Sequence, residues 1–222
     1  MNSSPDPLIS LSTNLARATN LIADIRYSPS RLADLSAAAL ACNCVEIGTS
    51  IFHLADCNAK AGLPVLLRSL LESSMRLALI AKDPACGHLS LELIDNIARL
   101  KLVGKNMPDK PLSIFLQSRN KELASAGAKK YSFADLLNHV NATDWYSIYR
   151  VFSAFSHAQL SALAEHFFEK QPTGTEIHWN RGLDERQFIA YFLTADQLVC
   201  IAIDAIERIF RIEAQRDTIT FA

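Results

Sequence analysis

The sequence contains few of the residues that build loops or cross-links. Its 222 residues include 7 glycines and 8 prolines, too few for a loop-rich or low-complexity chain. The five cysteines form no Cys-x-x-Cys pair and have no regular spacing. An odd, irregular set of this kind is typical of reduced thiols and not of a disulfide framework, so we expect a cytoplasmic protein.

The sequence also lacks a strong net charge and a targeting segment. The formal net charge is −1, so no overall basic field would attract nucleic acid. The first residues have neither the basic segment nor the apolar core of a signal peptide, and we expect none. The most apolar stretch, 191–210, is interrupted by Asp196, Asp204 and Glu207, which predicts a buried amphipathic helix and no membrane span.

Apolar residues at helical spacing are abundant, and half of the chain is hydrophobic. Without a strand series, an internal repeat or a linker, the sequence predicts an all-α fold, one domain over residues 1–222 with seven or eight helices and long antiparallel ones among them. Ser132 and Asp135 have the spacing of a capping box. The predicted helices cover residues 8–26, 30–59, 63–81, 89–105, 112–124, 132–139, 143–170 and 184–216, with a loop or small hairpin around Ile177, His178 and Trp179.

Positive charge is concentrated in one part of the chain. Between Arg99 and Lys130 there are eight basic residues and two acidic ones. A solvated helix face would have this composition. A docking patch for phosphates or for an acidic partner would have it too.

The predicted helix 143–170 carries a polar stripe on an otherwise apolar pattern. Tyr146, Arg150, Ser153 and His157 follow one another at helical spacing and are expected on one face, with Tyr149 beside them. Arg150 and His157 would lie about 10.5 Å apart along the helix axis. An arginine can neutralise a charged phosphorane, and a neutral histidine can accept a hydroxyl proton.

The spacing of these two residues has a known counterpart. Arg150, six residues and His157 resemble the Arg-x(4–6)-His motif of the HEPN superfamily of helical nucleotide-binding proteins and ribonucleases. The resemblance implies a four-helix core and a dimer in which two motifs face one cleft. It also implies metal-independent RNA cleavage, with Arg150 and His157 as the catalytic residues.

A second resemblance covers more of the chain, about residues 66–157. The segment LLRSLLESSMR, from Leu66 to Arg76, is followed by a later helix with Tyr149, Ser153 and His157. The pair resembles an uncharacterised bacterial all-helical family, known only as a domain of unknown function. This resemblance implies no activity.

Arg68, Glu72 and Arg76 lie one helical turn apart from each other. They could form an exposed ion ladder. Because their helix is otherwise nearly all apolar, they could instead face inward, where buried charges need partners. We hypothesise that Glu72 and Arg76 face the stripe of Tyr149, Arg150, Ser153 and His157 and form one polar pocket.

The sequence contains no clear pattern of a metal or cofactor site. The predicted helix 30–59 carries Cys42, Glu46, Thr49, His53 and Cys57 at helical spacing. A zinc site needs four converging ligands, and no other histidine pair has a matching spacing, so we favour a helix–helix seam and expect no metal. Because the sequence also has no Gly-rich phosphate loop, GxSxG or HExxH motif, we expect no cofactor.

Two functions from different classes remain. The first is a helical binding or interaction protein whose polar pocket, including Arg68, suits a small anion or a nucleotide. The second is a HEPN-like ribonuclease of the toxin or phage-defence type that uses Arg150 and His157 on RNA. We also expect a symmetric homodimer, because long amphipathic helices leave more apolar surface than one bundle hides.

Overall fold

The computed structural model describes residues 6–25, 32–56, 62–106, 110–157, 168–171, 174–177 and 183–210. Within these ranges the chain forms eight helices and one two-stranded hairpin, so the predicted all-α fold class is confirmed. The helices are α1 (Pro7–Asp24), α2 (Leu32–Asp56), α3 (Leu63–Lys82), α4 (Gly87–Asn106), α5 (Lys110–Ser125), α6 (Phe133–His139), α7 (Trp145–Ser156) and α9 (Glu185–Phe210). The strands are β1 (Phe168–Gln171) and β2 (Gly174–Ile177).

The predicted helix 143–170 is wrong at its C-terminal end. α7 ends at Ser156, residues 158–167 lie outside the described residues, and the strand β1 begins at Phe168 and pairs antiparallel with β2. Phe168 lies opposite Ile177, a pairing across the sheet that helical spacing in the sequence does not reveal. The hairpin precedes the position we expected for it, and His178 and Trp179 lie outside the described residues.

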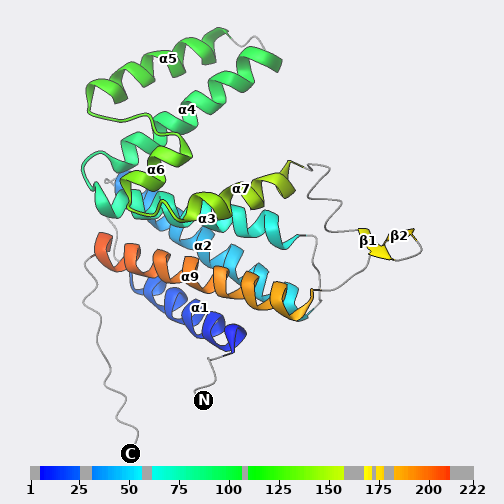
Figure 1. The fold of residues 1–222 in the computed structure, drawn as a ribbon. Coiled ribbons are helices and arrows are strands. Elements are labelled where there is room, and N and C mark those ends of the chain that lie inside the picture. The colour runs from blue at the N-terminus through cyan, green and yellow to red at the C-terminus, as the bar shows by residue number, and fades with distance from the viewer. Residues whose placement is uncertain are drawn as a thin grey trace, which may run out of the picture.

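Helix α3 lies at the centre of the bundle (Figure 1). It contacts α2, α4, α6, α7 and α9, and it buries leucines on several sides, among them Leu67, Leu70 and Leu77. Eleven of the 20 residues of α3 are buried, and the ladder of Arg68, Glu72 and Arg76 lies among the others. The helices α1 and α7 pack on different neighbours, α1 on α2 and α9 and α7 on α3.

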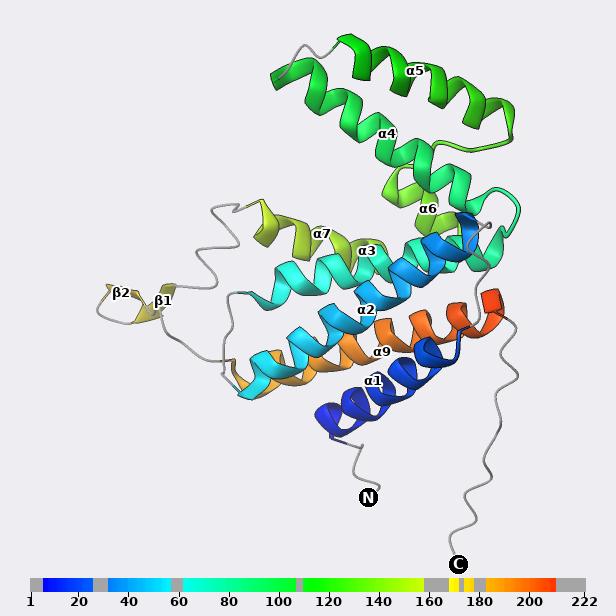
Figure 2. The same cartoon turned by 180° about the vertical axis from the view of Figure 1, so that it is seen from behind.

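The helices α4 and α5 form an antiparallel pair that extends away from the bundle in both views (Figure 1 and Figure 2). We call this pair the arm. At its base, a Cβ atom on Gly87 would lie 2.9 Å from the Cα of Ile80, so glycine allows α4 to begin close against α3. Arg119 of α5 donates two hydrogen bonds to the carboxylate of Glu92 on α4, at 2.7 and 3.0 Å, which ties the two helices together.

The short helix α6 turns the chain back so that α7 can lie on α3. The predicted capping box at its start is present, since the Ser132 hydroxyl accepts from the Asp135 backbone and the Asp135 carboxylate accepts from the Ser132 backbone. At its end, Asn141 has a φ of 61°, and the amide of Ala142 donates to the Leu137 carbonyl at 2.8 Å. This left-handed turn closes the helix and starts α7 four residues later.

Two helices, α2 over Leu32–Ala55 and α9, are long and apolar enough to cross a membrane by length and composition alone. Core helices of water-soluble bundles meet the same criteria. α9 packs against α1, α2 and α3, and its buried residues include Phe192, Leu198 and Ile206. Its composition is therefore accounted for by the packing of the bundle.

Candidate functional site

Arg68, Glu72 and Arg76 of α3 lie at the edge of the core. Their exposure is intermediate between the two alternatives that the sequence allowed, an exposed ion ladder and a buried set of charges. The side chain of Arg68 is 20% exposed and that of Glu72 31%, so the ladder is neither fully buried nor fully solvated. Arg68 Nε donates to Glu72 Oε1 at 3.0 Å. Arg76 does not continue this ladder, because its ion pair, at 3.4 Å, is with Asp95 of α4.

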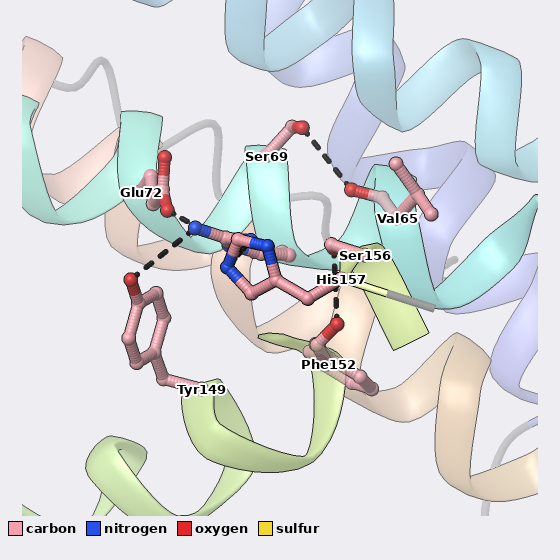
Figure 3. A network of polar contacts seen from close by, with 8 residues as sticks. Val65, Ser69, Glu72, Tyr149, Phe152, Ser156 and His157 are labelled. Carbon is pink, nitrogen blue, oxygen red and sulfur yellow. Dashed lines mark hydrogen bonds and ion pairs between the residues drawn. The ribbon is translucent and has the colours of Figure 1, made fainter. Parts of the chain in front are cut away.

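Arg68 connects α3 to α7. Its two terminal nitrogens lie 3.4 Å from His157 Nε2 and 3.4 Å from the Tyr149 hydroxyl, and its Cζ lies 5.3 Å from the centre of the Tyr149 ring. Figure 3 shows Glu72, Tyr149 and His157 converging from the two helices. Both 3.4 Å distances exceed the usual range for a nitrogen–oxygen or nitrogen–nitrogen hydrogen bond, so these contacts are weak.

The chemistry of the guanidinium fixes the direction of any hydrogen bond in this contact. Arginine has only donors, so a hydrogen bond between the two residues requires His157 Nε2 as the acceptor. Burial alone would lower the pKa of Arg68. The charge and hydrogen bond of Glu72, together with Tyr149, outweigh burial and raise that pKa above its ordinary value.

The residues of the polar stripe on α7 differ in burial. Tyr149 is partly buried, and its ring packs on Phe133 of α6 with the ring centres 4.1 Å apart. The Oγ atom of Ser153 is buried and has no hydrogen-bond partner within the described ranges. Arg150 is exposed and makes no hydrogen bond or ion pair with any residue that the structure describes. The structure therefore brings Arg68, Glu72, Tyr149 and His157 together but not Arg150.

A small cavity of about 150 Å³ lies beside this cluster, where α3, α4, α6 and α7 meet. Glu72, Arg76 and Tyr149 line it, as the pocket hypothesis expects, whereas Arg150, Ser153 and His157 do not. Tyr131 also lines it, and the Tyr131 hydroxyl is buried with no hydrogen-bond partner among the described residues. A buried hydroxyl in this state loses about 1–3 kcal/mol unless another molecule satisfies it.

Sequence reasoning did not find three residues of this site. Asp95, Tyr131 and Phe133 come from α4 and from the start of α6, and nothing in their local spacing indicates that they meet α3. Only the packing of these elements on α3 reveals them.

The other sequence-predicted features lie elsewhere or outside the described residues. In the basic stretch, Arg119 is paired with Glu92 and Glu122, whereas Lys101, Lys121, Lys129 and Lys130 are exposed, and the side chains of Lys105 and Lys110 are not described. Over the described ranges no three histidine, cysteine or acidic side chains converge as metal ligands would. Cys57, His166 and His178 lie outside these ranges.

Comparison with known proteins shows one match. A family of unknown function, DUF5677, matches residues 34–175, which is more than half of the chain. This range contains α2 except its first two residues, all of α3 to α7, and hence every residue of the site. No curated protein and no solved structure matches the chain significantly. The match shows that this chain belongs to the family of unknown function DUF5677.

Proposed function

We propose that the chain is a binding protein whose site between α3 and α7 holds a small anion, such as a phosphate group. The observation that supports the proposal is the set of contacts made by the three guanidinium nitrogens of Arg68. Glu72 holds its Nε at 3.0 Å, while the two terminal nitrogens have only 3.4 Å contacts. The ion pair with Glu72 thus orients the guanidinium, and its two terminal nitrogens, which make only weak hydrogen bonds, can donate to a ligand.

An oxyanion can exploit this arrangement. Two of its oxygens can accept from the two terminal nitrogens of one guanidinium, which is the geometry in which arginine binds phosphate and carboxylate best. The anion would replace two weak contacts, to His157 and Tyr149, with two strong ones. Because Glu72 cancels part of the positive charge, directional hydrogen bonds contribute more to this site than net charge does.

A nucleotide fits the same site. Tyr146 is exposed, and its ring stacks with that of Tyr149 at a centre-to-centre distance of 6.4 Å. A base can stack on an exposed tyrosine while Arg68 binds its phosphate.

The test is titration calorimetry with inorganic phosphate, pyrophosphate and AMP. We expect Arg68→Gln to weaken the tightest of these interactions about tenfold, as loss of a bidentate charged contact does. Arg17→Gln is the matched control, because it removes an ion-paired arginine from α1, which packs on α2 and α9. Absence of heat with all three ligands, or equal affinities for the two variants, would contradict the proposal.

A second candidate function is metal-independent RNA cleavage of the HEPN type. Two observations favour it. His157 is exposed at the C-terminal end of α7, and Arg150 is exposed on the same helix with no partner that the structure describes. His157 would accept the 2′-hydroxyl proton once its weak contact with Arg68 opens, and Arg150 would stabilise the charge on the phosphate. By the resemblance, a second copy of the chain would complete the cleft.

Incubation with mixed RNA in EDTA tests this candidate. We expect cleavage products with cyclic phosphate ends from the wild type and at least about a hundredfold less product from His157→Ala or Arg150→Ala, the usual contribution of an acid–base group. His53→Ala, which removes an exposed histidine of α2, should cleave like the wild type. RNA cleavage by His157→Ala at the wild-type level, or no RNA cleavage by the wild type, would exclude this function. Neither result would contradict the proposed anion binding.

A further inference from the structure

A groove separate from this site lies between the arm and the bundle. Its volume is about 510 Å³, and residues of α2, α4 and α5 form most of its lining. Arg76 of α3 lies at its base and also lines the small cavity described above. The arm, which carries two walls of the groove, extends away from the other helices (Figure 1 and Figure 2).

Two walls of the groove carry exposed apolar side chains. Phe115 of α5 is 63% exposed, and Leu112 of the same helix and Leu32 of α2 are exposed as well. Leu112, Phe115 and the buried Leu116 lie at the spacing of a single helix face and form an apolar strip, in which Leu112 and Phe115 are accessible. Exposed apolar side chains gathered in a concave site indicate a binding surface, whereas scattered ones do not.

The third wall, on α4, is polar and has an unbalanced charge. Its carboxylates are neutralised, because Asp95 pairs with Arg76 and Glu92 pairs with Arg119. Arg99 lines the same wall and has no ion pair or hydrogen bond within the described part of the chain. The free charge that the groove offers is therefore positive.

We propose that this groove binds an amphipathic helix of a partner protein, with apolar side chains against α2 and α5 and acidic side chains against Arg99. Apolar walls and the positive charge of Arg99 complement such a helix. Its apolar side chains, spaced one helical turn apart, would pack along the strip of α5. The concave shape favours an inserted helix over the flat surface of a membrane. Excess positive charge disfavours a second arm as the occupant, because two like-charged arms would repel each other.

Two fluorescein-labelled peptides test the proposal by anisotropy. Both carry leucines at helical spacing, and one has glutamates and the other lysines at the remaining positions. We expect the acidic peptide to bind the full-length protein at least about tenfold more tightly than the basic one, since only its charges complement Arg99. Equal binding of the two peptides, or no binding of the acidic one, would overturn the proposal.

The chain offers a matched pair of variants for each kind of contact. Phe115 lines the groove and its neighbour Ile114, 68% exposed, does not; likewise Arg99 lines it and Lys101 does not. We expect Phe115→Ser to weaken binding of the acidic peptide about tenfold and Arg99→Ser about fivefold, as for a central and a peripheral contact. Ile114→Ser and Lys101→Ser should change the affinity less than about twofold.

Two further measurements distinguish other occupants. Vesicles containing anionic lipid that bind the protein and displace the acidic peptide would assign the groove to a membrane and overturn the proposal. A dimer in sedimentation that Phe115→Ser dissociates and Ile114→Ser does not would assign it to a second copy, with the same consequence. All four variants change exposed side chains, and circular dichroism confirms that each remains folded.

Discussion

Arg68 and Glu72 show how a single pair of charges can lie between the two extremes that a sequence suggests. With exposed fractions of 20% and 31%, the pair is partly shielded from water but not sealed in the core. A fully buried partner would cost about 3–5 kcal/mol to remove, and an exposed one less than about 1 kcal/mol. The intermediate burial is therefore informative about stability as well as about ligand access.

We predict that Glu72→Gln lowers the free energy of unfolding by about 1 kcal/mol, the value typical of a half-buried charged hydrogen bond. Urea unfolding followed by circular dichroism measures it. Asp204→Asn is the control, because Asp204 and Arg208 form an ion pair with the same spacing on α9 but with both side chains exposed. A loss of about 3 kcal/mol or more for Glu72→Gln would show that the pair is more deeply buried than described here.

Cys42 and Cys44 differ in reactivity although both lie on α2. Cys42 is exposed, whereas Cys44 is buried and its sulfur lies 3.7 Å from the Ser74 hydroxyl. Burial raises the pKa of the Cys44 thiol to about 12, and the contact with Ser74 only partly opposes this. Since the thiolate is the reactive form, the folded protein keeps Cys44 inert at neutral pH.

Iodoacetamide labelling followed by mass spectrometry should therefore modify Cys42 in the native protein and leave Cys44 unmodified. In urea both should react. Modification of Cys44 at the rate of Cys42 under native conditions would mean that the seam between α2 and α3 opens readily.

At the scale of elements, α6 shows how a seven-residue helix depends on its cap. The hydrogen bonds of Ser132 lower the pKa of the Asp135 carboxyl below its ordinary value of 3.8. A carboxyl with a depressed pKa in the folded state stabilises the fold above its unfolded pKa, and this stabilisation is lost as the pH falls through the folded pKa. The start of α6, and with it the position of Phe133 and Tyr131, is thus sensitive to acid.

We predict that Ser132→Ala lowers the free energy of unfolding by about 1 kcal/mol near neutral pH, because it removes the acceptor for the Asp135 amide. The difference from wild type should shrink as the pH falls below 3.8, where the Asp135 carboxylate is progressively protonated in both states. Urea unfolding curves across this range measure it. Ser125→Ala, at the last residue of α5, should have no such pH dependence, and a constant difference for Ser132→Ala would refute the role of Asp135.

At the scale of the whole molecule, the homodimer expected from the sequence stays a prediction. Exposed apolar residues outside the groove, such as Val65, Val151, Ile189 and Leu193, could form its interface. We expect light scattering at micromolar concentration to show twice the 24.5 kDa mass of the chain. Because the groove is assigned to another partner, Phe115→Ser should leave that mass unchanged, and a 24.5 kDa species would contradict the dimer.

The sequence by itself determined the fold class and the start of most helices. α1 to α6 begin within two residues of the predicted positions, because apolar spacing, prolines and the capping box act locally. It also selected Arg68, Glu72, Tyr149 and His157, since polar residues that interrupt an apolar helical pattern need partners. The family match over residues 34–175 is likewise a property of the sequence.

Only the tertiary structure decided which of these residues meet. Helical spacing places Arg150 and His157 on one face, yet the packing of α7 on α3 turns His157 toward Arg68 and leaves Arg150 exposed. The same spacing cannot show that Asp95 competes for Arg76, or that residues 168–171 form the strand β1, which pairs with β2. Contacts between segments distant in sequence depend on the arrangement of whole elements, and a one-dimensional period contains no information about it.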